Sequence, residues 1–151
     1  MDFHYTNSGR HAPHGLRSIL SVANPALVAS TLFRAIAATS GPVHIIYRWL
    51  CLVFFASDVS TGAIFEGPVE FPHPTGIVIG RGVRIGSCAR VFRNLTFGSS
   101  RKGEYPLIGA NVTFTTGASL PGTLPVGPGA MVGPICVVTV SSFGLVFFSP
   151  S

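Results

Sequence analysis

The sequence predicts a mainly β protein, in which a parallel β-helix follows a short α-helical segment. Two observations support this fold class. After residue 58 an apolar residue recurs every six positions, whereas the apolar residues before position 56 follow a helical spacing. A six-residue period fits neither a helical solenoid nor the two-residue alternation of an amphipathic strand. It is typical of a hexapeptide-repeat solenoid, in which three short faces make one turn of about 18 residues.

We therefore divide the chain into three parts. Residues 1–56 form an N-terminal helical segment, residues 57–140 form the β-helix domain, and residues 141–151 form an atypical C-terminal tail.

The helical segment has the start and stop signals of two helices. Asn24 before Pro25 is a good pair for the N-cap and the first helical position, and Gly41-Pro42 ends the run that follows. A second helix is expected from about Val43 to Phe55. Its apolar residues lie nearly all round the helix, so we expect it to be buried.

The composition indicates a surface with unusually little charge. Only 10% of the residues are charged, against about 25% in an ordinary soluble domain, so we expect burial against partner subunits. The nine arginines and one lysine are spread thinly along the chain, without a basic run that contains aromatic residues. This distribution argues against nucleic-acid binding and favours an anionic small molecule as the ligand.

The sequence predicts a cytoplasmic protein without stable membrane insertion. Its N-terminus lacks the basic region and apolar core of a signal peptide. The most apolar run, near residues 45–56, contains Arg48 and is shorter than the roughly 20 residues of a membrane span. Cys51, Cys88 and Cys136 have no CxxC or metal-ligand spacing, so we expect reduced, buried thiols and no metal site.

The six-residue repeat defines which side chains point into the coil. Large apolar residues occupy its first position, and a second small or apolar residue follows four places later. The first positions are Val59, Phe65, Phe71, Ile79, Ile85, Val91, Phe97, Ile108, Phe114, Leu120, Val126, Val132 and Val138. The second positions are Ala63, Val69, Val83, Ala89, Leu95, Val112, Ala118, Leu124, Ala130 and Cys136.

The repeat is interrupted twice, and each interruption predicts a loop outside the coil. Two extra residues separate Phe71 from Ile79, and five extra residues separate Phe97 from Ile108. Insertions in a solenoid are expelled as outer loops, where binding residues usually lie. The first loop contains His73, the only histidine after residue 44, and the second loop reads GSSRKGEYP.

The spacing of the repeat allows Asp58 to act together with His73. Asp58 stacks one turn below Val78, and His73 lies in the loop that leads up to that position. A carboxylate there can fix the tautomer of the imidazole and stabilise the imidazolium that forms on proton uptake. Such a pair is a general base suited to activating a hydroxyl near neutral pH. Asp58 can alternatively cap or turn the chain where the helices end.

These residues resemble the left-handed β-helix domain of serine acetyltransferases and their hexapeptide-repeat acyltransferase relatives. The resemblance runs from DVSTGAIFEGPVEFPHPTGIVIG through RNLTFGSS to YPLIGANVTFTTGASLPGTLPVGPGAMVGPICVV, about residues 57–138. Its most specific element is HxTGIVIG with an aspartate fifteen residues before the histidine. The resemblance implies a left-handed coil, a homotrimer, acetyl-CoA in the groove between neighbouring coils, and a catalytic dyad of His73 and Asp58.

The resemblance also implies which residues bind the coenzyme. In that family the contacts are largely backbone amides, which fall here near Gly98, Ser99, Thr116, Gly117 and Ala118. Arg101 and Lys102 in the second loop can meet the phosphates, as can the coil residues Arg81, Arg84, Arg90 and Arg93.

The acceptor site departs from the family pattern. Serine acetyltransferases have an aspartate directly before the catalytic histidine and Arg-His-Pro in the long loop. The matching positions here are Pro72 and Glu104-Tyr105-Pro106. The missing arginine removes a charge-assisted contact with a carboxylate. Tyr105 is alternatively a packed loop aromatic.

One main functional prediction and two alternatives follow. The main prediction is an acetyl-CoA-dependent O-acetyltransferase resembling serine O-acetyltransferase, with a backbone amide or loop side chain at the oxyanion. The first alternative is an O-acetyltransferase that acts on a sugar or polysaccharide precursor. The second is a non-catalytic β-helix scaffold, which the changed loop and the C-terminal sequence TVSSFGLVFFSPS would permit.

Overall fold

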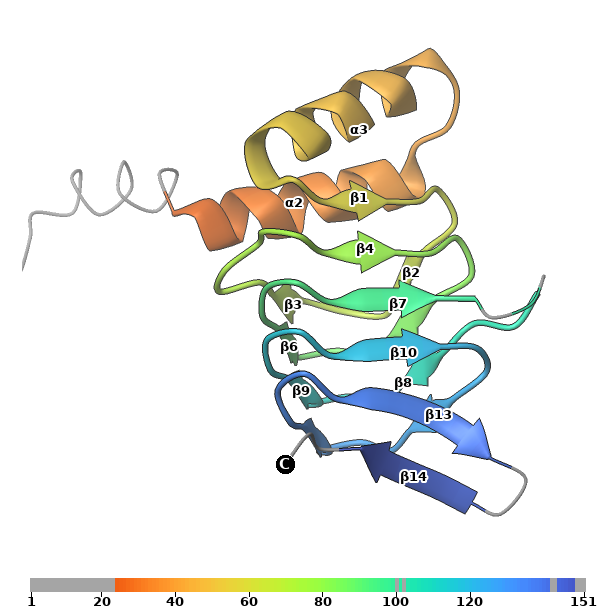
Figure 1. The fold of residues 1–151 in the computed structure, drawn as a ribbon. Helices are drawn as coiled ribbons and strands as arrows, with labels where there is room; N and C mark the ends of the chain where they lie inside the picture. The colour runs from red at the N-terminus through yellow and green to blue at the C-terminus, as the bar shows by residue number, and fades with distance from the viewer. Residues whose placement is uncertain (1–23, 100, 102, 142–143, 149–151) are drawn as a thin grey trace, which may run out of the picture.

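Residues from Asp58 onward form three sheets that wrap around a common axis (Figure 1). The computed structural model describes residues 24–99, 101, 103–141 and 144–148. Within these ranges the chain makes a left-handed parallel β-helix of about four turns, with two helices at its N-terminal end. The predicted fold class is confirmed.

Each sheet takes one short strand from every turn of the coil. Sheet A has the order β1 (Asp58–Val59), β4 (Val78–Ile79), β7 (Thr96–Gly98), β10 (Ser119–Pro121), β13 (Val137–Ser141) and β14 (Gly144–Phe148). Sheet B contains β2 (Ile64–Phe65), β5 (Arg84–Ile85), β8 (Leu107–Ile108) and β11 (Pro125–Val126). Sheet C contains β3 (Val69–Glu70), β6 (Ala89–Val91), β9 (Thr113–Phe114) and β12 (Met131–Val132). Neighbouring strands are parallel except β13 and β14, which pair antiparallel and extend sheet A beyond the last turn.

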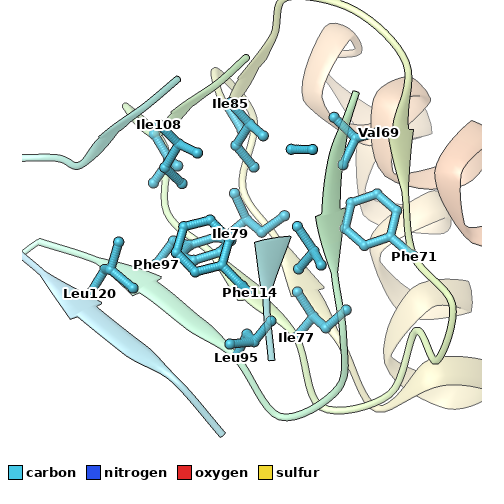
Figure 2. Packing of buried hydrophobic residues seen from close by; sticks show 14 of the residues in the cluster. Val69, Phe71, Ile77, Ile79, Ile85, Leu95, Phe97, Ile108, Phe114 and Leu120 are labelled. Atoms are coloured by element: carbon cyan, nitrogen blue, oxygen red, sulfur yellow. The ribbon is translucent and has the colours of Figure 1, made fainter. Parts of the chain in front are cut away.

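The interior of the coil contains the side chains that the repeat predicts there (Figure 2). All first positions are buried except Phe65 and Val126, which are partly buried, and Ala130 is the one second position that is partly buried. Ile77, which lies in neither set, is also fully buried. Fully burying a large apolar side chain contributes roughly 1.5–3 kcal/mol, so this stack is the main source of stability of the coil.

The two helices cover the N-terminal end of the coil (Figure 1). Helix α2 (Pro25–Ala38) begins as predicted, because the side chain of Asn24 accepts a hydrogen bond from the amide of Ala26 at 3.0 Å. Its buried face places Phe33 against Phe71 of the coil, with 4.8 Å between the ring centroids. This packing shields the apolar interior of the first turn, which an open coil end would expose to water.

Helix α3 (Pro42–Phe55) is largely exposed, so the prediction of a buried helix was wrong. Cys51 is the buried residue of this helix, whereas the side chains of Trp49 and Phe54 are 64% and 72% exposed. The reason is its position, because α3 packs against α2 and β1 and lies outermost at the helical end (Figure 1). A helix with apolar residues on every side therefore contacts this chain with one side only.

The cysteines differ from the prediction at one position. Cys51 and Cys136 are buried as expected, whereas Cys88 is exposed. Cys88 lies in the turn between β5 and β6 with φ of +58°, directly before the inward-facing Ala89, so its side chain is outside the core. In the described part of the chain, no helix is long and apolar enough to cross a membrane.

Candidate functional site

The first predicted loop lies where the chain passes from sheet C to sheet A. It connects β3 to β4, and it is expelled from the coil as the break in the repeat predicts (Figure 1). We call this edge of the coil the His73 edge, because the exposed side chain of His73 lies on it.

Ser57 holds this loop from the preceding turn. Its fully buried hydroxyl lies 3.0 Å from the carbonyl of Phe55 and 3.2 Å from that of Pro74, and can donate to either. The same hydroxyl accepts a hydrogen bond from the amide of Ile77 at 3.0 Å, and the amide of Gly76 donates to the carbonyl of Phe55 at 3.1 Å. Because buried polar groups require partners, these bonds fix the path of the loop.

Gly76 allows the loop to approach the next turn closely. Its φ of +69° favours glycine, and a Cβ at this position would lie 2.3 Å from Oδ1 of Asn94. The backbone amide of Asn94 in turn donates to the carbonyl of Thr75 at 2.9 Å. Contacts with both neighbouring turns thus give His73 a fixed backbone on the outside of the coil.

The ring of His73 lies beside Phe92 on the next turn, which Arg90 also contacts. Its centroid is 6.2 Å from that of Phe92, and the guanidinium carbon of Arg90 lies 5.9 Å from the same phenyl ring. Nε of Arg90 donates to Oε2 of Glu70 at 2.8 Å. His73 is exposed, and among the described residues neither of its ring nitrogens has a hydrogen-bond partner.

Asp58 has the predicted position, but its carboxylate binds an arginine. The parallel pairing of β1 and β4 places Asp58 opposite Val78. Arg48 on α3 donates from Nε to Oδ1 at 2.7 Å and from Nη2 to Oδ2 at 2.6 Å. These hydrogen bonds and the negative charge of Asp58 raise the pKa of Arg48. The dyad of Asp58 with His73 stays a prediction.

Asp58 also influences a thiol on α3. Burial raises the pKa of Cys51 to about 12, and the nearby charge of Asp58 adds to this effect. The thiol therefore remains protonated near neutral pH and is a poor nucleophile.

The second predicted loop connects β7 to β8 and leaves sheet A at the other end of its strands. In it the hydroxyl of Ser99 donates to the carbonyl of Arg101, while Lys102 lies outside the described residues. The half-buried ring of Tyr105 packs over Gly82, where a Cβ would lie 2.2 Å from Cδ2 of the tyrosine. Tyr105 therefore packs on the coil as a loop aromatic, while its contact with an acceptor stays a prediction.

The predicted ligand-binding residues are divided between two edges of sheet A. Pro72 lies on the His73 edge, directly before His73. The predicted coenzyme contacts in the connection from β9 to β10 lie on the same edge: Thr116, Gly117 and Ala118. The others lie on the opposite edge (Figure 1): Gly98, Ser99, Arg101, Glu104 and Tyr105. Within one copy of the chain, the second loop, between β7 and β8, therefore does not lie next to His73.

One of the predicted coenzyme contacts is already occupied by the coil itself. The amide of Gly117 donates to the carbonyl of Arg93 at 3.1 Å, so it is used in the stacking of turns. The four coil arginines proposed as phosphate contacts, Arg81, Arg84, Arg90 and Arg93, are exposed as expected.

A hollow of about 510 Å³ opens between the start of α2 and the outer face of sheet C. Glu70 and Arg90 line it, so the charged pair near His73 also borders a space of the size that small ligands occupy. Within the described ranges, no group of three or more His, Cys, Asp or Glu residues is close enough to hold a metal ion.

Arg48, Ser57 and Phe92 belong to this site although they were not predicted as parts of it. A signal existed for Arg48, which is the only charged residue between positions 35 and 57. Ser57 and Phe92 gave no signal, because their contacts depend on how successive turns stack.

Comparison with known proteins identifies serine acetyltransferases as relatives. No protein-family model matches the chain. The serine acetyltransferase of Buchnera aphidicola subsp. Schizaphis graminum is 36% identical over 83 residues, which are 52% of this chain and 32% of that protein. That of Bacillus subtilis is 31% identical over 88 residues, which are 56% of this chain and 41% of that protein. The chain thus matches about a third of the length of the first relative and two fifths of the second.

Solved structures of enzymes with this name share the fold. Serine acetyltransferase isoform 3 of Entamoeba histolytica, in complex with cysteine, gives a TM-score of 0.66 at 21% identity, over 95% of this chain and 55% of that chain. A serine acetyltransferase in complex with CoA gives 0.60 at 19% identity, over 91% of this chain and 58% of that chain. The resemblance to serine acetyltransferases is confirmed.

Proposed function

We propose that the chain acts as a cytoplasmic O-acetyltransferase, which transfers the acetyl group of acetyl-CoA to a hydroxyl. The position of His73 carries this proposal, because its imidazole is held on the outside of a coil that is similar to serine acetyltransferases. The acceptor that the names of these relatives favour is serine.

In the proposed reaction His73 is the general base. A ring nitrogen takes the proton of the acceptor hydroxyl, and the hydroxyl oxygen attacks the thioester carbonyl. Asp58 orients the imidazole and stabilises its charged form, while a backbone amide or a loop side chain stabilises the tetrahedral oxyanion. The carbon–sulfur bond then breaks, the proton passes from His73 to the sulfur, and CoA leaves as the thiol.

We further propose that the complete site forms between copies in a homotrimer. The residues assigned to coenzyme and acceptor lie on two edges of sheet A, and the strands between them keep these edges apart within one chain. A neighbouring copy can place its second loop beside the His73 edge, which would bring Arg101, Glu104 and Tyr105 to the acetyl-CoA groove. CoA binding by a structural neighbour supports this coenzyme assignment.

The charged pair near His73 supports serine over a sugar as acceptor. Arg90 donates from Nε to one carboxylate oxygen of Glu70, Oε2. The terminal nitrogens of Arg90 can therefore bind the carboxylate of an amino acid, and the second oxygen of Glu70 can bind its ammonium group. These contacts would take over the roles of the family residues replaced here by Pro72 and the Glu104-Tyr105-Pro106 stretch.

The test is release of free thiol from acetyl-CoA in the presence of L-serine or a panel of sugars. We expect His73→Ala to lower the rate about 10²–10⁴-fold with the preferred acceptor, while His44→Ala on α3 serves as the matched histidine control. Glu70→Gln and Arg90→Gln are expected to raise KM for L-serine, and Glu70→Gln should leave KM for acetyl-CoA unchanged.

The outcomes separate the three functional predictions. His73-dependent release with sugars alone would identify the sugar acetyltransferase. Binding of acetyl-CoA without His73-dependent release for any acceptor would contradict the enzyme and favour the non-catalytic scaffold.

A further inference from the structure

Arg48 is an isolated charge on an otherwise apolar helix. It is the only Asp, Glu, Lys or Arg residue of α3, whose other exposed side chains include Trp49 and Phe54. Its guanidinium is bound to Asp58, the carboxylate that the proposed reaction needs. Exposed ion pairs contribute little to stability, so stability alone is a weak reason for a charge at this position.

The geometry of the pair leaves the carboxylate able to accept a further hydrogen bond. Arg48 contacts both oxygens in a two-point arrangement, Nε with Oδ1 and Nη2 with Oδ2. A carboxylate has about four lone-pair sites, so two remain for another donor such as an imidazole N–H. A two-point contact with the planar guanidinium also fixes the plane of the carboxylate, which a single contact would not.

The same stretch of chain holds the loop that carries His73. Ser57, directly before Asp58, bonds to Pro74 and Ile77 of the loop. The amide of Asp58 donates to the carbonyl of Ile77 at 2.8 Å. The orientation of Asp58 and the position of the loop are therefore determined at one junction between α3 and the coil.

We propose that Arg48 is a positioning residue, which fixes the Asp58 carboxylate for His73 and partly neutralises its charge. This inference rests on the proposed function. A partly neutralised carboxylate stabilises an imidazolium less than a free one. Arg48 thus acts on His73 through Asp58, without touching the substrate.

Other charged or titratable groups face this region, and the variants leave them unchanged. They are His44, which lines the same hollow on α3 as Arg48, Cys51 on the inner side of α3, Glu70 on β3 and Arg90 on β6. A difference between variants therefore reports the change at Arg48 or Asp58.

The experiment follows the imidazole signal of His73 by NMR from pH 5 to 9, in the full chain without acetyl-CoA, with His73→Ala to assign the signal. We expect the midpoint of the titration to move to higher pH by about half a unit in Arg48→Gln. In the Asp58→Asn background the same substitution should give a clearly smaller shift, because only the direct field of Arg48 on His73 then changes. Arg34→Gln is the matched control, because Arg34 also joins a helix to the coil, through the carbonyl of Gly67 at 3.2 Å.

Rates provide a second readout. The acid limb of the kcat/KM profile should move with the NMR midpoint in Arg48→Gln. Arg48→Lys retains the charge and loses the two-point contact, so we expect an unchanged midpoint and a kcat at least threefold lower.

Two results would overturn the inference: an equal shift with and without the Asp58 carboxylate, or no shift in a folded Arg48→Gln protein. If that variant does not fold, wild-type kcat in Arg48→Lys overturns it instead. Failure of the proposed function is distinguishable, because wild type would then release no thiol while the coupling between Arg48, Asp58 and His73 remained measurable.

Discussion

Replacing Ser57 by alanine tests whether the junction between helix and coil holds the His73 loop. The hydroxyl is fully buried and bonds to the amide of Ile77 at 3.0 Å and the carbonyl of Pro74 at 3.2 Å. Alanine leaves both groups without this partner, and a buried group that loses its hydrogen bond costs about 1–3 kcal/mol. For a chain of this length, we expect a fall in Tm of about 2–10 °C.

The substitution should also reduce the proposed activity. A displacement of about 1 Å can cost a reaction up to about a hundredfold in rate. Because the loop loses two of its bonds to the preceding turn, we expect kcat to fall about tenfold or more, with KM for acetyl-CoA unchanged. Thermal unfolding and thiol release, both at one fixed protein concentration, measure the two effects.

Ser30→Ala provides the matched control for this prediction. The hydroxyl of Ser30 donates to the carbonyl of Val69 at 2.8 Å, so it also joins a helix to the coil, but at β3 and not within the loop. We expect Ser30→Ala to keep kcat within about twofold of wild type, because its loss leaves the bonds of Ser57 intact. Unchanged stability and kcat in Ser57→Ala, or the same loss of kcat in Ser30→Ala, would refute the reasoning.

Three further predictions concern other groups of the chain. Gly82→Ala should displace the ring of Tyr105, which its Cβ would meet at 2.2 Å, and near-ultraviolet circular dichroism should show this; an unchanged tyrosine signal would contradict the packing. In the native protein a thiol reagent should modify Cys88 rapidly, and Cys51 and Cys136 only after unfolding, which peptide mass spectrometry of the labelled chain can check. Stability should fall as the pH rises from about 9 toward 12, because the unfolded Cys51 thiol ionises while the folded one, with a pKa of about 12, keeps its proton. Urea midpoints of wild type and Cys51→Ala measure this slope, which should be flatter in the variant.

The interior of the coil was predictable from the sequence, because it depends on one repeated pattern. Each large apolar residue at the first position needs the same environment, so the period alone places residues as distant as Val59 and Val138 in one core. The two loops were predictable for the same reason, since a break in the period has no room inside the coil. The start of α2 followed from a local signal, the pair of Asn24 and Pro25.

The surroundings of His73 were not predictable in the same way. Phe92 and Asn94 reach the loop from the next turn, Arg90 lies over Phe92, and these side chains follow no period. The sequence of α3 shows which of its residues are apolar, but it does not show which other parts of the protein cover them. Trp49 and Phe54 are exposed for this reason, although the sequence of the helix is typical of a buried one.

The helical segment has two physical roles, which the junction at Arg48 and Ser57 connects. Helix α2 covers the open end of the coil through Phe33 and Phe71, a contact that any apolar helix of suitable shape can supply. The junction is more specific, because Arg48 fixes the Asp58 carboxylate and Ser57 fixes the loop. Since both roles belong to one continuous stretch of chain, a movement of α3 relative to the coil would alter Asp58 and the His73 loop together. A replacement helix that only covers the coil should therefore restore folding without restoring the proposed activity, unless it also supplies the arginine and the serine.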